Sequence, residues 1–197
     1  MASKADKRKA ELRQNLIEIA ERRIEAKGLT SLRARDLAGE AGCAVGAIYN
    51  VFADMNDLTM AVNGRTFRKI GEAVGQSLQG TEGQPPVDRL IVMSNAYLAF
   101  AAENVLLWRA LFDIDMADDG TVPDWYMEEL RKLFANIAGP VSELFPELDP
   151  KELELMVRAL FSSIHGIVLL GLQNRISGVP RGNIERMIAQ VLCRIGN

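Results

Sequence analysis

The segment from Leu37 to Val51 has the residue types and spacing of a helix-turn-helix. Such a motif needs a small residue inside its first helix, so that the second helix can approach closely. It then needs a glycine for the turn and apolar residues that bury the second helix. Ala38, Gly42 and Ile48 meet these demands in order. An ordinary αα-hairpin satisfies the same packing rules, so the spacing favours a DNA-binding motif without excluding the hairpin.

Other residues with reactive or metal-binding side chains are sparse. His165 is the only histidine, and Cys43 and Cys193 lie far apart with no CxxC pair. This pattern disfavours a disulfide framework and a zinc site. The sequence also has no Gly-rich phosphate loop and no Ser-His-Asp or Cys-His constellation. We therefore expect a protein that is not an enzyme and that binds no metal and no cofactor.

The elements that position these residues are helices almost throughout. Apolar residues at three- and four-residue spacing predict helices near 7–27 and 45–51, and one that begins with Ser31 as N-cap and ends at Gly42. Gly28 would end the first helix. Further helices, separated by Gly and Pro, are predicted near 54–78, 86–103, 105–113, 122–144, 150–173 and 183–195. The fold class is therefore all-α, with a three-helix head over 1–53 followed by a larger helical body over 54–197.

Composition and charge restrict the class of protein further. The chain of 197 residues is 48% hydrophobic and 25% charged, as in an ordinary globular domain. No uninterrupted apolar stretch reaches the length of a membrane span, and the N-terminus is too polar for a signal peptide. A cytoplasmic protein without membrane association is expected. Residues 1–52 are net basic whereas the remainder is net acidic, which indicates that one end binds a polyanion.

Several short motifs in the head resemble those of TetR/AcrR-type transcriptional regulators. They are Gly28-Leu29, Arg35-Asp36-Leu37-Ala38, Ala41-Gly42 and Gly46-Ala47-Ile48-Tyr49, followed by Phe52 and Leu58. The resemblance implies a helix-turn-helix DNA-binding head and an antiparallel helical body for ligand binding and dimerisation. It also implies a mechanism in which a small effector enters the body, re-spaces the two heads of a homodimer and releases DNA.

The same resemblance implies which residues contact DNA. The third helix would be the recognition helix in the major groove, Tyr49 would touch a backbone phosphate, and Arg35 would reach a base edge. An arginine can bind guanine through two hydrogen bonds, an asparagine can read adenine, and small apolar side chains suit the thymine methyl group. The residues implied to contact DNA are Arg35, Ala44, Val45, Gly46, Ala47, Tyr49 and Asn50.

Three positions depart from the family pattern. Val51 stands where many members have an aromatic residue or histidine, and Met55 stands where many have a lysine; both usual residues hold phosphates. Arg33 occupies a frequent Ser or Thr N-cap position, so Ser31 is expected to cap instead. A basic N-terminal run could compensate as an arm, although a solvated tail is the commoner interpretation of such a run. The run comprises Lys4, Lys7, Arg8 and Lys9.

The body has a looser resemblance, over 97–104 and 107–112, to a TetR subgroup named for a Trp-His-Gly motif. Of that motif only His165-Gly166 is present here. His165 lies in the apolar run 164–172. It is either a core histidine whose ring nitrogens are hydrogen-bonded within the protein or a polar group that orients an effector. Aromatic residues at helical spacing are either core or the wall of an apolar pocket. With His165, the residues predicted to contact an effector are Tyr97, Phe100, Trp108, Phe112, Trp125 and Phe161.

The last two helices hold more apolar residues than one core needs. In the resembled family the two helices pair with their symmetry mates, and a two-fold dimer would place its heads on successive half-sites of a pseudo-palindromic operator. The resemblance and the apolar surplus thus imply a homodimeric repressor that binds double-stranded DNA and is released from it by a small molecule. The alternatives are a monomer with a large core and, for function, a helical interaction protein of this fold with weakened or lost DNA binding.

Overall fold

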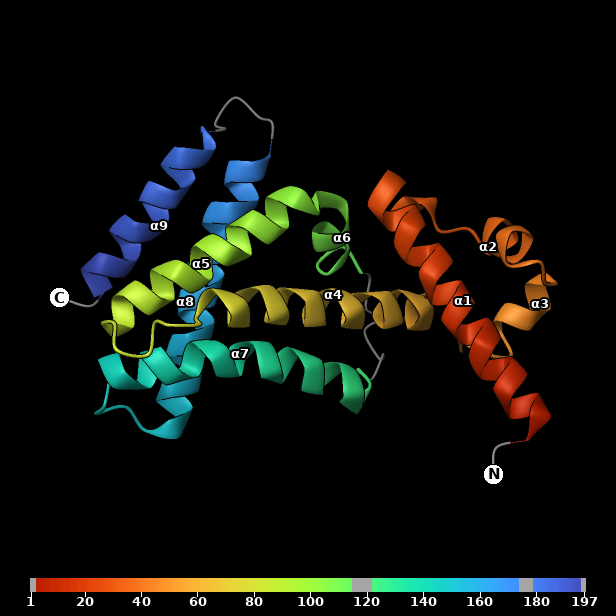
Figure 1. Ribbon diagram of the computed structural model, residues 1–197, viewed down its shortest axis with the longest axis horizontal. Helices are drawn as coiled ribbons and strands as arrows, with labels where there is room; N and C mark the ends of the chain where they lie inside the picture. Colours follow the sequence, from red (N-terminus) through yellow and green to blue (C-terminus); the bar gives the residue numbers. More distant parts are fainter. Residues whose placement is uncertain (1–2, 115–121, 174–178, 196–197) are drawn as a thin grey trace. The chain divides into compact units, whose positions relative to one another are not determined.

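The computed structural model describes residues 3–114, 122–173 and 179–195, and all regular elements in these ranges are helical. This confirms the all-α prediction. The helices are labelled in Figure 1. Their bounds are α1 (Lys4–Lys27), α2 (Ala34–Ala41), α3 (Val45–Ile48), α4 (Met55–Ser77), α5 (Pro86–Glu103), α6 (Val105–Ala110), α7 (Asp124–Leu144), α8 (Pro150–Leu172) and α9 (Arg181–Ile195).

The chain forms two compact units. Unit 1 comprises Met1–Arg68 and Asn104–Tyr126, and unit 2 comprises Lys69–Glu103 and Met127–Asn197. The division falls inside the long helix α4. The functional boundary expected between residues 53 and 54 remains a prediction. Each unit is described below by itself.

Unit 1 is built on α1, which begins earlier than the sequence pattern suggested. Ser3 and Asp6 form a capping box, in which each side chain accepts a hydrogen bond from the other's backbone N–H, at 3.1 and 3.0 Å. The basic residues near the N-terminus therefore lie on a helix instead of a tail. One apolar face of α1 is buried against α2 and α6. Its buried residues are Leu16, Ile17, Ile19, Ala20 and Ile24.

Two glycines at positive φ end the first two helices of unit 1. Gly28 ends α1 at φ 78°, and Gly42 ends α2 at φ 66°, in the left-handed region that residues with a Cβ rarely adopt. The expected N-cap is wrong, because Arg33 precedes α2. The hydroxyl of Ser31 instead donates to the carbonyls of Gly28 and Arg23, at 2.6 and 3.1 Å. Ser31 thus closes the end of α1, and α2 begins without a side-chain cap.

Unit 2 contains the close-packed helices α5, α8 and α9, with α9 contacting both others. Asp149 caps α8 by accepting from the backbone N–H groups of Lys151 and Glu152. Near the other end of α8, Gly171 lies so close to α9 that an added Cβ would approach Ile184 Cδ1 to 2.6 Å. The buried residues of α8 and α9 are Val157, Leu160, Ile164, Val168, Ile184, Ile188 and Leu192.

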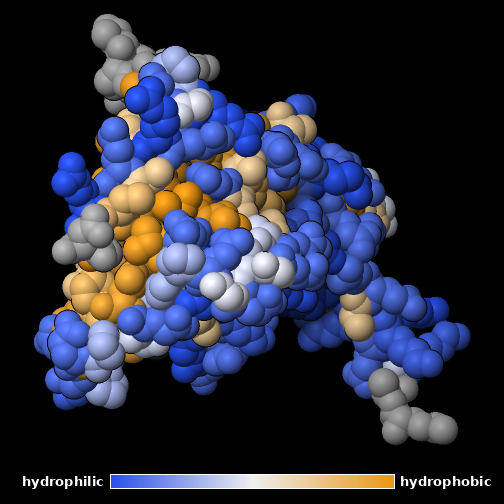
Figure 2. Space-filling view, turned by 60° about the vertical axis from the view of Figure 1, so that its left-hand side comes forward, coloured by the Kyte–Doolittle hydropathy of each residue, from blue (hydrophilic) through white to orange (hydrophobic). Residues whose placement is uncertain are grey.

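Helix α8 also has an exposed apolar side. Leu155 and Leu170 are 58% and 62% exposed, and Met187 on α9 is 39% exposed. Figure 2 brings this part of unit 2 forward and shows hydrophobic residues gathered into one continuous patch. By length and composition alone α8 could cross a membrane. That is weak evidence, because apolar helices of soluble proteins have the same properties.

Candidate nucleic-acid interface and aromatic cluster

The turn before α3 and α3 itself have one buried and one exposed side. Ile48 is fully buried in the core of unit 1. Val45 and Tyr49 are 38% and 50% exposed, and Asn50 is also exposed. Helix α3 is therefore held by one apolar side chain, and the other side is free to contact a partner. Six of the residues predicted to contact DNA lie in this segment, and one of them, Ala47, is half-buried. The other five are exposed: Ala44, Val45, Gly46, Tyr49 and Asn50.

Arg35 lies in the first turn of α2 and is exposed, as a base-contacting residue must be. Arg33, immediately before the helix, is exposed too. The first turn of α2 has no side-chain cap, so its free backbone N–H groups and the helix dipole favour an anion there. The first turn also holds Asp36, whose carboxylate is paired with Arg23. Two arginines next to this uncapped helix start therefore make this corner of unit 1 suitable for a phosphate.

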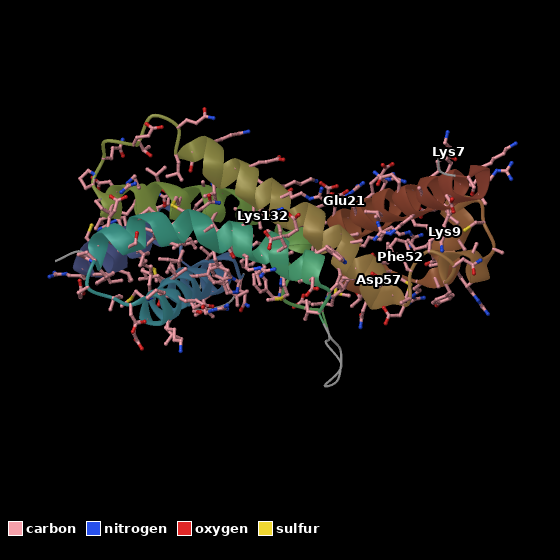
Figure 3. The ribbon with its side chains drawn as sticks, turned by 90° about the horizontal axis from the view of Figure 1, so that it is seen from below. Lys7, Lys9, Glu21, Phe52, Asp57 and Lys132 are labelled. Carbon is pink, nitrogen blue, oxygen red and sulfur yellow. The ribbon has the colours of Figure 1, made fainter. Side chains whose placement is uncertain are left out.

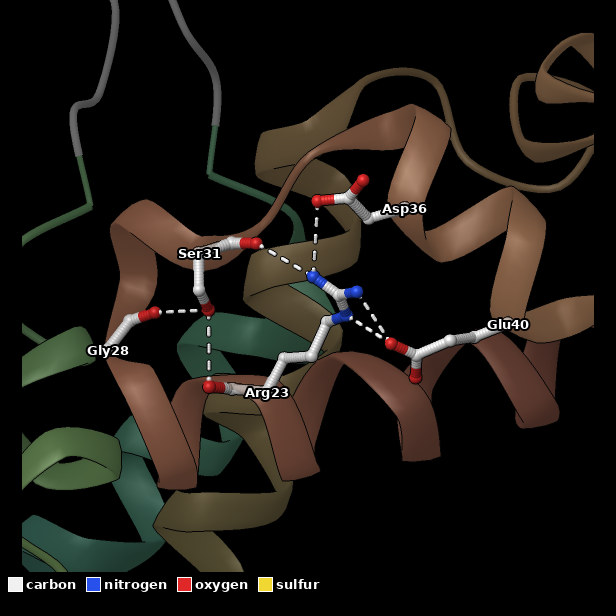
Figure 4. A network of polar contacts seen from close by, with 5 residues as sticks. All are labelled: Arg23, Gly28, Ser31, Asp36 and Glu40. Carbon is white, nitrogen blue, oxygen red and sulfur yellow. Dashed lines mark hydrogen bonds and ion pairs between the residues drawn. The ribbon is translucent and has the colours of Figure 1, made fainter.

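An ion-pair network orients α2 against α1 (Figure 4). The guanidinium of Arg23 binds Glu40 Oε1 at 2.6 Å and Asp36 Oδ2 at 3.3 Å. It also donates to the carbonyl of Ser31 at 3.3 Å. The carboxylates, Glu40 first, raise the pKa of Arg23. Since all three acceptors lie in or before α2, one arginine fixes the helix that precedes the turn.

The start of α4 carries negative charge, which our interpretation of the sequence missed. Asp54 Oδ1 accepts from the backbone N–H of Asp57 at 2.7 Å, and Asp57 Oδ2 accepts from that of Ala53 at 3.1 Å. The pair forms a reciprocal cap in which both carboxylates face backbone N–H groups. The Asp-x-x-Asp spacing of the sequence was the available signal. Met55 supplies no cation at this helix start. The carboxylates of Asp54 and Asp57 already accept from backbone N–H groups that could otherwise bind a phosphate, so the start of α4 is a poor phosphate site.

In unit 2 three of the predicted effector residues come together. The hydroxyl of Tyr97 lies 2.9 Å from His165 Nδ1. The ring of Phe161 stacks on that of His165, with centroids 5.7 Å apart and planes at 20°. Phe134 of α7 joins them edge to face, 5.1 Å from Phe161. Phe134 is an aromatic residue that the predicted set omitted. We call Tyr97, Phe134, Phe161 and His165 the aromatic cluster.

The aromatic cluster contains one partly buried polar pair, Tyr97 and His165. Burial lowers the pKa of His165, so the imidazole is neutral near pH 7. A neutral ring protonated at Nε2 accepts the hydrogen bond from Tyr97 at Nδ1, whereas the other tautomer donates it. The cluster therefore combines flat apolar rings with one polar pair, the hydroxyl of Tyr97 and Nδ1 of His165.

The other predicted effector residues lie elsewhere in the chain. Phe100 is buried on α5 in unit 2. Trp108 and Phe112 contact each other edge to face in unit 1, 5.6 Å apart. Trp125 contacts Tyr126, 5.7 Å away, and a Cβ at Gly64 would come within 2.9 Å of its indole. The seven predicted residues are thus divided between the two units, because helical spacing identifies buried faces without showing which faces meet. Their role in effector binding remains a prediction.

One polar contact in unit 1 could not be predicted from the sequence. Asn63 is fully buried on α4, and its amide donates to the carbonyl of Ala110 at 3.0 Å. Next to it, burial raises the pKa of Tyr126, and a hydrogen bond with Asn63 partly opposes that rise. Asn63 thus joins α4 to the end of α6. Only the tertiary structure reveals this role, since an isolated asparagine in a helix carries no pattern.

Comparisons with known proteins place these features in a family. The family model described as the tetracycline repressor-like C-terminal domain matches residues 90–194. A search of curated proteins found no match. The match to residues 90–194 covers more than half of the chain and lies in the body, whereas the motifs recognised in the sequence lie in the head.

Solved structures share the fold over almost the whole chain. A protein of unknown function from Rhodococcus sp. RHA1 is 22% identical, with a TM-score of 0.73 over 93% of this chain and 94% of that one. RolR in complex with resorcinol is 18% identical, with a TM-score of 0.70 over 96% and 89%. A TetR-family regulator from Streptomyces coelicolor is 20% identical, with a TM-score of 0.67 over 94% and 80%. The chain belongs to the tetracycline repressor-like (TetR) family of transcriptional regulators.

Proposed function

We propose that the protein is a homodimeric repressor that binds a pseudo-palindromic DNA operator and is released from it by a small aromatic effector. The observation that carries the proposal is the exposed side of the turn and α3, where Val45, Tyr49 and Asn50 face solvent while Ile48 anchors the helix. Exposed apolar and amide groups on a firmly held helix match what reading of base edges requires.

The dimer is supported by the apolar patch on α8 and α9. Leu155 and Leu170 are long side chains that expose more than half of their surface. Monomeric soluble proteins rarely leave large contiguous apolar patches in water. A second copy would cover the patch through a two-fold axis, and the two heads would then bind symmetric half-sites.

The effector class is inferred from the aromatic cluster. Stacked rings beside the Tyr97 and His165 pair favour a flat molecule with one or two hydroxyl groups. RolR, which has this fold, was solved with resorcinol, a molecule of that class. We therefore take resorcinol as the first probe for this chain.

Footprinting on the DNA upstream of the protein's own gene tests the proposal. We expect two protected half-sites about one helical turn apart, with protection lost when resorcinol or a related phenol is added. Phe161→Ala should abolish the response to the phenol and leave protection intact. The matched control Phe145→Ala, which removes an aromatic ring outside the aromatic cluster and outside the predicted effector set, should still respond. Protection without paired half-sites would contradict the dimeric repressor.

A second candidate function is an interaction protein that has kept the fold and lost DNA binding. Two observations favour it: α4 begins with paired carboxylates at Asp54 and Asp57, and Met55 supplies no cation. This candidate predicts no footprint at any salt concentration. An enzyme is not proposed, because members of the family act as regulators.

A further inference from the structure

Helix α3 has the sequence Val45-Gly46-Ala47-Ile48 and carries no charge. Most of the affinity of a protein for a duplex comes from cations that neutralise phosphates. The start of α4 holds Asp54 and Asp57 and would repel a phosphate. The cations that hold DNA on this flank of α3 must therefore come from another element.

Arg13 of α1 is placed to be one of them. Its guanidinium lies 4.9 Å from the centroid of the Phe52 ring. Phe52 is 2% exposed and belongs to the core of unit 1, so the ring is a fixed platform for the cation. Along the chain it comes three residues after Tyr49 and three before the start of α4. An α1 side chain thus brings positive charge to the segment that joins α3 to α4.

The charge of Arg13 is not neutralised by a neighbour. Among the described residues no carboxylate forms an ion pair with it, whereas Arg23 and Arg65 of the same unit each bind two carboxylates. A guanidinium stacked on an aromatic ring keeps its N–H groups at the edge of its plane free for a phosphate. Arg13 is therefore a preorganised cation that no carboxylate of the described residues neutralises.

Lys9 extends this positive surface. It is exposed and lies one helical turn before Arg13, so both are on the same side of α1. In the view of Figure 3, Phe52 lies between Lys9 and Asp57. The carboxylate of Asp6 accepts a hydrogen bond from the backbone N–H of Ser3 in the N-terminal cap. The bonding to Ser3 chiefly lowers the pKa of Asp6, and the charge of Lys9 lowers it further.

We propose that Arg13 and Lys9 contact the DNA backbone on the α4 side of α3, where the start of α4 carries carboxylates and no cation. The inference rests on the proposed DNA binding, and it names the residues that supply the electrostatic part of that binding. DNA is the partner that fits, because Arg13 lies over Phe52, just after a helix whose exposed side is uncharged. The contact is to phosphate and carries no base preference.

The salt dependence of DNA binding tests this proposal. Fluorescence anisotropy would be measured with the full-length protein on a labelled duplex of its own upstream DNA and on a scrambled duplex, from 50 to 300 mM salt. Each phosphate contact contributes about 0.9 to the slope of log K against log salt. Arg13→Gln and Lys9→Gln should each reduce the slope by about 0.9, and should weaken binding to both duplexes by a similar factor. Arg13→Lys should restore the slope.

Arg22→Gln is the matched control. Arg22 is exposed on α1 and lies nine residues from Arg13, which places it on the opposite side of the helix. The same change of charge there should leave the slope unchanged. Slopes equal to wild type in both Arg13→Gln and Lys9→Gln would overturn the inference while leaving DNA binding standing. A wild-type protein that binds neither duplex at 50 mM salt would overturn the inference and the proposed function together.

Discussion

Replacing Gly171 by alanine should destabilise unit 2, although Gly→Ala usually stabilises a helix. The new Cβ would lie 2.6 Å from Ile184 Cδ1 and 2.8 Å from Cγ1. Ordinary contact begins at 3.4 Å, so the Ile184 side chain would have to move by roughly 0.8 Å. Ile184 is 1% exposed and β-branched, and such a side chain has few alternative rotamers in a helix.

The magnitude follows from two opposing effects. Overpacking of a rigid core costs about 1–3 kcal/mol. The helix propensity of alanine returns at most about 1 kcal/mol, and less here because Gly171 is next to the last residue of α8. We expect the free energy of unfolding to fall by about 1–2 kcal/mol, which corresponds to roughly 2–8 °C in melting temperature for a chain of this size.

Urea denaturation at one fixed protein concentration measures the effect. Gly75→Ala is the control, because a Cβ at Gly75 of α4 meets nothing within 4 Å; it should stabilise by about 0.5–1 kcal/mol. Ile184→Val removes Cδ1, so the double variant with Gly171→Ala should recover part of the loss. If Gly171→Ala stabilised the protein as much as Gly75→Ala, the close packing of α8 and α9 described here would be wrong.

Three further predictions address the head, the dimer and the titratable group. Arg23→Met should loosen α2, and a double-mutant cycle with Glu40→Gln in urea should give a coupling of about 0.5–1 kcal/mol; zero coupling would refute it. Leu170→Glu should change the fold little but yield monomers in sedimentation velocity, whereas an intact dimer would exclude Leu170 from the interface. Burial lowers the pKa of His165 from 6.5, so the unfolded chain binds the proton first, and the free energy of unfolding should fall as pH drops through 6.5. His165→Phe should remove that decline between pH 7.5 and 5.5, and an unchanged decline would contradict the assignment.

The helix-turn-helix could be predicted from the sequence because its requirements are local. Gly42 must adopt positive φ, Ala38 must allow close approach and Ile48 must be buried, and each property belongs to one residue type at one position. Ser31 was assigned wrongly for the same local reason. A serine two residues before Arg33 looks like a cap, but its hydroxyl finds the carbonyls of Gly28 and Arg23 first.

The aromatic cluster and the charge of the head depend on contacts between distant segments. Tyr97 and His165 lie on α5 and α8, and no periodic pattern shows that their rings meet. From the sequence, Arg13 is indistinguishable from an ordinary cation on the polar side of an amphipathic helix. Only the structure shows that its guanidinium lies over the ring of Phe52. Sequence periodicity identifies the apolar side of each helix, and the partner of that side is decided by tertiary packing.

The central claim, that the head binds a specific DNA sequence, is tested most directly by fluorescence anisotropy at one intermediate salt concentration. The protein would be titrated into a labelled duplex of its own upstream DNA, with unlabelled upstream or scrambled duplex as competitor. We predict that the upstream duplex competes at least 1,000-fold better, as is typical of specific regulators. Equal competition by the scrambled duplex would contradict the claim, because it would show that the exposed side of α3 does not read sequence.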